Sequence, residues 1–210
     1  MKLYDAEWAP SPRRVRIFLA EKGIEVARET IDLRSGEHLH DAYLDINPRG
    51  AVPALELDDG QVLCESAAIC RYFEALQPAP PLFGTTPLEI GRIESWTRRI
   101  EADGYAAVAY VFRNTISAFK DRAIVGNWPA VPQIPELATR GAIMWNGFLD
   151  AFDHQLAGSR WVTGETYSFA DVTALVTIDF ARAARLALPE RHANVRRWHA
   201  EASARPSAAA

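Results

Sequence analysis

A proline-rich stretch divides the chain into two parts of different pattern, and this division constrains the fold more than any other feature. Residues 78–87 hold four prolines, one glycine and two threonines between runs of helical spacing, a composition typical of an interdomain linker. Strand-like and helix-like runs alternate before it, whereas apolar residues recur only at helical spacing after it. We therefore predict two domains, residues 1–80 and 88–210, joined by a linker at residues 81–87.

The first part has the order strand, helix, strand, followed by a hairpin and a further helix. Lys2–Asp5 and Val26–Ile31 have strand composition. Between them, Ser11 and Pro12 have the signature of an N-cap and first turn, and Gly23 marks the helix end. A β-α-β unit followed by β-β-α predicts a compact α/β domain on one small sheet.

The stretch Asn47–Ile69 holds the densest set of signals. Val52-Pro53 opens an alternating run that turns at Asp59-Gly60 and resumes at Val62–Cys64, which predicts a β-hairpin. Proline cannot donate to a strand ladder. We therefore expect an edge position for this strand, with neighbouring backbone left free for a ligand.

Glu65 and Ser66 follow the hairpin at the expected start of a helix. Ser66 can cap that helix, whose N-terminus favours a carboxylate or phosphate, while Glu65 can accept a hydrogen bond from an ammonium group. The pair therefore suits the zwitterion of an amino acid. A plain helix cap beside a solvated acid also explains these two residues, and on the dipeptide alone it is the simpler interpretation.

The second part predicts an all-helical domain. Leu88–Phe119 has the spacing of one long helix or a bent pair, and Glu136–Leu156 predicts another helix. Ser168–Asp171 forms a capping box before an apolar helix, and a final helix is expected over Pro189–Ala204. Three prolines within Gly126–Pro135 indicate a stiffened loop.

Composition excludes several classes of partner. The 210 residues carry a formal net charge of −4 without a basic stripe, so we expect no nucleic-acid partner. No signal-peptide core or bilayer-length apolar run is visible, so we expect a cytoplasmic protein without membrane association. Cys64 and Cys70 do not form a Cys-x-x-Cys motif, and no histidine ligand pair is present, so we expect no metal site.

Five motifs, in order along the whole chain, resemble those of cytosolic glutathione transferases. They are Ser-Pro-Arg-Arg-Val-Arg-Ile-Phe-Leu-Ala-Glu-Lys-Gly-Ile at 11–24, Gly-Glu-His-Leu at 36–39, Asn-Pro-Arg-Gly-Ala-Val-Pro-Ala-Leu at 47–55, Glu-Ser at 65–66 and Ser-Phe-Ala-Asp-Val at 168–172. The bacterial and fungal branch with a Ser-Pro-Asn-Pro-like loop is the most similar. The resemblance implies a thioredoxin-like N-terminal domain followed by an all-helical C-terminal domain.

The resemblance also implies a binding site for glutathione as co-substrate. In the family, the proline that matches Pro53 is cis, and the backbone of the residue matching Val52 pairs with the cysteinyl part. The residues matching Glu65 and Ser66 hold the γ-glutamyl ammonium and carboxylate groups. His38 matches a position that helps to bind the glycyl carboxylate in some classes.

The loop that would face the sulfur departs from the family pattern. The usual hydroxyl position falls on Ala9, and the asparagine position falls on Ser11. Three interpretations stay open: Ser11 donates to the thiolate, Ser11 caps the helix while backbone N–H groups hold the sulfur, or the second domain supplies a donor. Ser11 is the candidate catalytic residue, as the thiolate contact. Trp8, Tyr110, Arg113 and Asn114 are candidates for the electrophile pocket, although aromatic residues at helical spacing also suit a core.

The resemblance therefore implies a glutathione S-transferase whose bound thiolate attacks a small hydrophobic electrophile, by conjugation or substitution. It also implies a homodimer that makes contact through the long helix from Leu88, and a role in detoxification. A glutathione-dependent disulfide reductase or peroxidase is one alternative. A non-catalytic glutathione-binding or regulatory module of the same fold is another, and Ala9 favours it.

Overall fold

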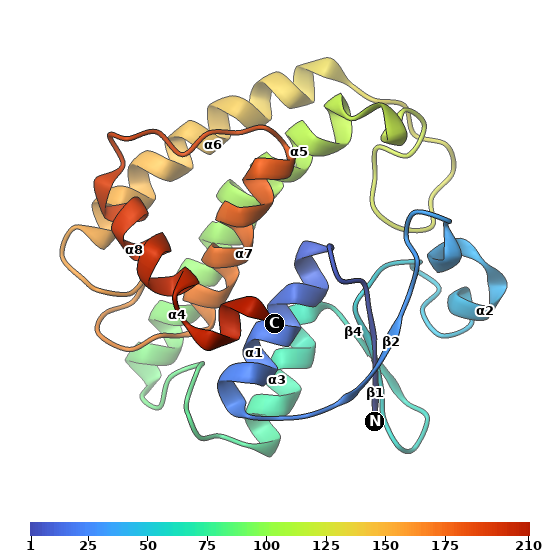
Figure 1. Ribbon diagram of the computed structural model, residues 1–210, viewed down its shortest axis with the longest axis horizontal. Helices are drawn as coiled ribbons and strands as arrows, with labels where there is room; N and C mark the ends of the chain where they lie inside the picture. Colours follow the sequence, from blue (N-terminus) through green and yellow to red (C-terminus); the bar gives the residue numbers. More distant parts are fainter. The chain divides into compact units, whose positions relative to one another are not determined.

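The computed structural model describes residues 1–210 and separates into two compact units. The first comprises Met1–Pro80 with Ile124–Ala130 and Ala210, and the second comprises Pro81–Ala123 and Val131–Ala209. The first unit combines a sheet with helices, whereas the second is helical (Figure 1). These findings confirm the predicted thioredoxin-like domain followed by an all-helical domain.

Four short strands form the sheet of the first unit in the order β2-β1-β3-β4. They are β1 (Lys2–Asp5), β2 (Ala27–Thr30), β3 (Ala54–Glu56) and β4 (Val62–Cys64). Strand β1 pairs in parallel with β2 and antiparallel with β3, and β3 pairs antiparallel with β4. Leu3 and Leu55, which face each other in the register of β1 and β3, are both 0% exposed. The β-α-β unit and the hairpin were therefore predicted correctly.

The prediction of an edge position after Pro53 was wrong. Strand β3 lies inside the sheet, between β1 and β4, and its first paired residue is Ala54. Because Pro53 precedes that residue, its missing N–H removes no bond from the ladder. The peptide bond between Val52 and Pro53 is cis, as the family resemblance implied.

Helices α1 (Pro10–Lys22) and α3 (Ser66–Leu76) lie side by side on one face of the sheet (Figure 1). A 3₁₀ turn, η1 (Glu37–Leu39), and the short α2 (Asp41–Leu44) occupy the irregular segment before the hairpin. Helix α1 ends at Gly23 in the left-handed conformation, with the Ile24 N–H donating to the Leu19 carbonyl at 2.9 Å. This end matches the predicted glycine cap.

The serine caps predicted for α1 and α3 lie two residues and one residue too late, respectively. The N-cap of α1 is Ala9, whose carbonyl accepts from the Arg13 N–H at 3.3 Å, so Ser11 is the second helical residue. Proline is favoured at the first helical position, and Pro10 rather than Pro12 occupies it. The N-cap of α3 is Glu65, and Ser66 is the first helical residue.

Two buried cations fix α1 within the first unit. Arg16 donates to the Asp5 carboxylate at 2.5 Å and to the Glu7 carbonyl at 2.7 Å, which ties the helix to the loop after β1. The Lys22 ammonium contacts Glu74 and the carbonyls of Gln77 and Pro80 at 2.5 to 2.7 Å. Buried charges need such partners because desolvation is costly. The middle of α1 is therefore held beside β1, and its last residue is held beside the end of α3.

The second unit begins with one almost continuous helical run. Helix α4 (Pro87–Arg99) starts with a capping box between Thr86 and Glu89, and it passes through a π-helical turn, η2 (Ile100–Tyr105), into α5 (Ala106–Thr115). The predicted long helix is therefore interrupted by wider turns rather than by a break. At the interruption, Gly104 has no side chain, which lets the Phe148 ring approach its backbone closely.

The second unit continues with five more helical segments. They are η3 (Ser117–Phe119), α6 (Pro135–Leu156), α7 (Phe169–Ala183), α8 (Ala193–Ser203) and η4 (Pro206–Ala209). The predicted capping box is present at the start of α7, where Oδ2 of Asp171 accepts from the Ser168 N–H at 3.0 Å and from the Ser168 hydroxyl at 2.9 Å. Helix α7 is buried along most of its length, so it forms the core of this unit. No helix of the chain combines the length and apolar character needed to cross a bilayer.

Candidate functional site

A braced turn before β3 leaves one backbone segment unpaired. The Ala51 carbonyl accepts from the Tyr43 hydroxyl and from the Asn47 amide, each at 2.7 Å. The next residue, Val52, makes no backbone hydrogen bond within the chain, because the ladder begins at Ala54. An unpaired backbone N–H and C=O beside a sheet can bind an extended peptide as a neighbouring strand would.

Glu65 and Ser66 form the second part of the site, at the N-terminus of α3. Glu65 has φ 70° and ψ 119°, an uncommon conformation for a residue with a side chain, and its carbonyl accepts the first helical bond from Ile69 at 3.0 Å. Because Glu65 takes the cap position, the Ser66 hydroxyl is not used as a cap and bonds no other residue. The turn thus presents a carboxylate, a hydroxyl and the positive end of a helix dipole.

The N-terminal turn of α1 is the third part. Its first three residues are Pro10, Ser11 and Pro12. Because proline has no N–H, Ser11 is the only one of the three with an amide donor, in addition to its hydroxyl. Ala9 is buried and has no side-chain polar atom. Among Ala9 and these three residues, only Ser11 has a side chain that can donate a hydrogen bond.

The other candidates in the first unit occupy distinct environments. His38 is buried as the middle residue of η1. Trp8 is 51% exposed, and the Arg34 guanidinium lies 6.0 Å from its ring centroid. Burial and the Glu65 carboxylate raise the pKa of the Cys64 thiol, and burial raises the pKa of Cys70. Neither cysteine therefore has the lowered pKa of a reactive thiol.

The candidates in the second unit make contacts of their own. Tyr110 is 38% exposed on α5. The Arg113 guanidinium lies 4.4 Å from the Phe119 ring centroid and donates to the Arg122 carbonyl at 3.1 Å; burial lowers its pKa. Asn114 donates to the Tyr110 carbonyl and accepts from the Ile134 N–H, each at 2.8 Å. Its amide therefore joins the end of α5 to the start of α6.

One residue beside the site, Arg49, was not predicted from the sequence. The Arg49 guanidinium donates to Oε1 of Glu65 at 2.5 Å. In the sequence, Arg49 lies 16 positions before Glu65 and has no spacing that links the two. The only signal was its place at the centre of the Asn-Pro-Arg-Gly motif.

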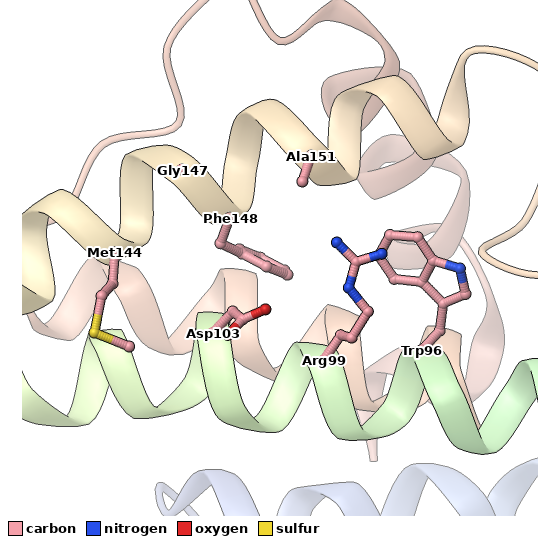
Figure 2. Close-up of a pocket in the computed structure, with 7 residues that line it drawn as sticks. All are labelled: Trp96, Arg99, Asp103, Met144, Gly147, Phe148 and Ala151. Atoms are coloured by element: carbon pink, nitrogen blue, oxygen red, sulfur yellow. The ribbon is translucent and has the colours of Figure 1, made fainter.

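A separate pocket lies within the second unit, between α4 with η2 and α6 (Figure 2). Its volume is about 250 Å³, near the lower end for small-molecule pockets. The Arg99 guanidinium lies over Trp96, 4.3 Å from the ring centroid. None of the residues that line it was predicted as a site residue from the sequence. They are Trp96, Arg99, Asp103, Met144, Gly147, Phe148 and Ala151. The chain contains no group of three or more His, Cys, Asp or Glu side chains arranged to hold a metal ion.

The fold and the site define a class of protein: a thioredoxin-like domain with an unpaired backbone segment and an acidic helix start, followed by a helical domain. Family comparisons agree with it. Residues 8–76 match the model of the glutathione S-transferase N-terminal domain, and residues 145–206 match that of the C-terminal domain.

Individual relatives cover nearly the whole chain. Glutathione S-transferase 2 of Saccharomyces cerevisiae is 35% identical over 99% of this chain and 87% of its own length. The crystal structure of Gtt2 from Saccharomyces cerevisiae is similar, with a TM-score of 0.90 at 34% identity over 99% of this chain and 98% of that one. A class Gtt2 glutathione S-transferase of Vibrio parahaemolyticus has a TM-score of 0.83 at 32% identity, covering 99% and 94%. The chain belongs to the glutathione S-transferase family.

Proposed function

We propose that this protein is a glutathione transferase that binds glutathione on its first unit and directs the thiolate at a small hydrophobic electrophile. One observation carries the proposal. Beside the unpaired backbone of Val52, the free Ser66 hydroxyl and the Glu65 carboxylate stand together at the N-terminus of α3. Membership in the glutathione S-transferase family supports it.

Each group has a partner in glutathione. The Val52 backbone suits the cysteinyl residue as a short added strand. Glu65 suits the γ-glutamyl ammonium group, and Ser66 with the α3 amides suits the adjacent carboxylate. His38 is proposed to contact the glycyl carboxylate. Pro53 directs the chain into β3, so that Val52 stays outside the ladder.

The proposed chemistry begins with loss of the thiol proton from bound glutathione to solvent. The helix dipole of α1 and the Ser11 donors stabilise the thiolate. Its sulfur lone pair forms a carbon–sulfur bond with the electrophile. In substitution the leaving group departs with the electron pair of its bond, and in addition the displaced electron pair takes up a proton.

The alternatives make different demands. A reductase or peroxidase that used a protein thiol would need a low-pKa cysteine, and both cysteines have raised pKa values. Glutathione alone can still reduce peroxides or disulfides. A non-catalytic module would bind glutathione without lowering its thiol pKa, in keeping with Ala9.

Retention on immobilised glutathione tests the site. We expect wild type to be retained, and Glu65→Gln and Ser66→Ala to be lost from the resin. Glu29→Gln is the matched control, because Glu29 is half-exposed and pairs with Lys2 instead. Retention of both site variants would refute the assignment. Turnover across a panel of electrophiles and peroxides then separates transferase, peroxidase and non-catalytic behaviour.

We further propose that the protein is a cytoplasmic homodimer with a detoxifying role. Leu88 and Ile90 support the contact through α4, since they are 62% and 42% exposed on its first turn. Trp8, Tyr110, Arg113 and Asn114 are proposed contacts of the electrophile, and kinetic specificity after their replacement tests each one.

A further inference from the structure

The loop Ile124–Ala130 packs on the turn that leads to Val52. The Asn127 N–H donates to the Arg49 carbonyl at 2.7 Å, and the Asn127 amide donates to the Pro48 carbonyl at 3.5 Å. The two segments can approach closely because each has a glycine at the contact, Gly50 in the turn and Gly126 in the loop. A Cβ on Gly50 would lie 3.1 Å from the Asn127 backbone nitrogen, and a Cβ on Gly126 would collide with the Arg49 carbonyl oxygen.

Apolar burial does not explain this docking. Ile124 and Val125 are each 46% exposed, and Trp128 is 57% exposed. The Trp128 indole instead closes the loop by donating to the Val125 carbonyl at 3.0 Å. Pro129 limits the conformations of the loop further. The loop is thus held by backbone contacts with the turn and by its own stiffness.

The same turn carries the partner of Glu65. The Arg49 N–H donates to the Asn47 side chain at 3.2 Å, and the Arg49 guanidinium donates to Oε1 of Glu65 at 2.5 Å. The second oxygen of Glu65 receives no hydrogen bond from the chain and can accept one from a ligand ammonium. Both side chains are largely exposed, at 60% and 66%. Exposed ion pairs contribute little to stability, so this pair is better explained by orientation of Glu65 than by folding.

We propose, on the basis of the glutathione binding proposed above, that Arg49 is a positioning residue for that ligand. Its guanidinium holds Oε1 of Glu65 so that Oε2 faces the γ-glutamyl ammonium group. The loop Ile124–Ala130 fixes the Arg49 backbone and is therefore part of the same device. Residues from the second half of the sequence thus set the affinity of a site built by the first half.

Binding of two ligands tests the role of Arg49. The first is glutathione, and the second is its analogue in which hydrogen replaces the γ-glutamyl amino group. We expect Arg49→Ala to weaken glutathione binding about fivefold and to leave the affinity for the analogue unchanged. The kcat at saturating glutathione should be retained. Arg49→Lys should restore part of the loss. Lys2→Ala is the control, because it removes a different exposed ion pair, which joins β1 to β2.

A second pair of variants tests the loop. Gly126→Ala should raise the KM for glutathione, because the added methyl group displaces the Arg49 carbonyl. Gly60→Ala should leave KM unchanged: Gly60 also has a positive φ, of 82°, but a Cβ there would meet nothing within 4 Å.

Several outcomes would overturn the proposal. Wild-type affinity in Arg49→Ala would exclude a role for its side chain, and equal losses for both ligands would mean that Arg49 does not act through the ammonium. Equal KM values for Gly126→Ala and Gly60→Ala would exclude a role of the loop in glutathione binding. A wild type that binds neither ligand would instead refute the proposed function itself.

Discussion

The indole N–H of Trp198 donates to Oδ1 of Asp171 at 2.8 Å, and both side chains are fully buried. The same oxygen accepts from the Val162 N–H at 2.9 Å, while Oδ2 accepts from the N–H and hydroxyl of Ser168. One carboxylate therefore joins the start of α7, the preceding loop and α8.

Replacement of this carboxylate by an amide should destabilise the second unit. In Asp171→Asn, one of the two oxygens becomes an NH₂ group that faces donors, so we expect the free energy of unfolding to fall by about 2–4 kcal/mol. Urea denaturation measures this change. Asp45→Asn, at an exposed site, should change stability by less than about 0.5 kcal/mol. Equal effects of the two substitutions would contradict the role of Asp171.

The same residue should make stability depend on pH. Burial raises the pKa of Asp171 to about 6, from an ordinary value of 3.8. The folded chain then keeps this proton at a higher pH than the unfolded chain does, so the contribution is full below pH 3.8 and is lost as the pH rises through about 6. The difference between these two pKa values corresponds to about 3 kcal/mol in the free energy of unfolding. The stability advantage of wild type over Asp171→Asn should therefore shrink between acidic and neutral pH in denaturation series, and a constant advantage would contradict this.

Two glycines of α6 should respond oppositely to the same substitution. A Cβ on Gly141 would lie 2.6 Å from the Ala107 carbonyl oxygen of α5, whereas a Cβ on Gly147 would meet nothing within 4 Å. We expect Gly141→Ala to destabilise by about 1–3 kcal/mol. Gly147→Ala should stabilise by about 0.5–1 kcal/mol, because alanine is the better helix former. Thermal unfolding of both variants checks the difference in sign.

The Ser11 hydroxyl should lower the thiol pKa of bound glutathione. Loss of this donor in Ser11→Ala should raise that pKa by about one unit, as followed by thiolate absorbance during a pH titration. Ser35→Ala is the control, since the Ser35 hydroxyl bonds the Asp32 carbonyl within its own turn. An unchanged titration would leave the Ser11 amide and the helix dipole as the stabilising groups.

The proposed dimer makes a prediction for sedimentation. Wild type should sediment as a dimer at micromolar concentration, and Leu88→Glu should shift it towards monomer, because a carboxylate would replace an exposed apolar contact. Ile134→Glu is the control, at a site that is 46% exposed outside α4. A monomeric wild type would exclude the dimer.

Local patterns were sufficient to predict most of the fold. The hairpin around Gly60, the glycine end of α1 and the capping box at Ser168 all depend on neighbours in sequence, and the structure confirms each one. The helix starts were less predictable. Helix α1 already begins at Pro10, one residue before Ser11, and in α3 Glu65 takes the N-cap position one residue before Ser66.

Long-range contacts were beyond local patterns. Pro53 indicated a missing ladder bond but not the strand order, because that order depends on which strand pairs with β1. Arg49 and the Ile124–Ala130 loop meet across more than 70 positions, through backbone atoms that any residue possesses. The sequence therefore pointed to Glu65, Ser66 and the backbone beside Pro53 as parts of the candidate site, and it missed the long-range contacts of Arg49 with Glu65 and with the loop.

The two prolines in the first turn of α1 bear on selectivity. A helix start normally offers several amides in a fan, which suits anions with several oxygens, such as phosphate. Pro10 and Pro12 remove two of these amides and leave that of Ser11. The turn can thus offer one amide to a charge centred on one atom, as in a thiolate, while it gives little to a polyoxygen anion. Abundant cellular phosphates should therefore compete poorly at the position where the sulfur is expected.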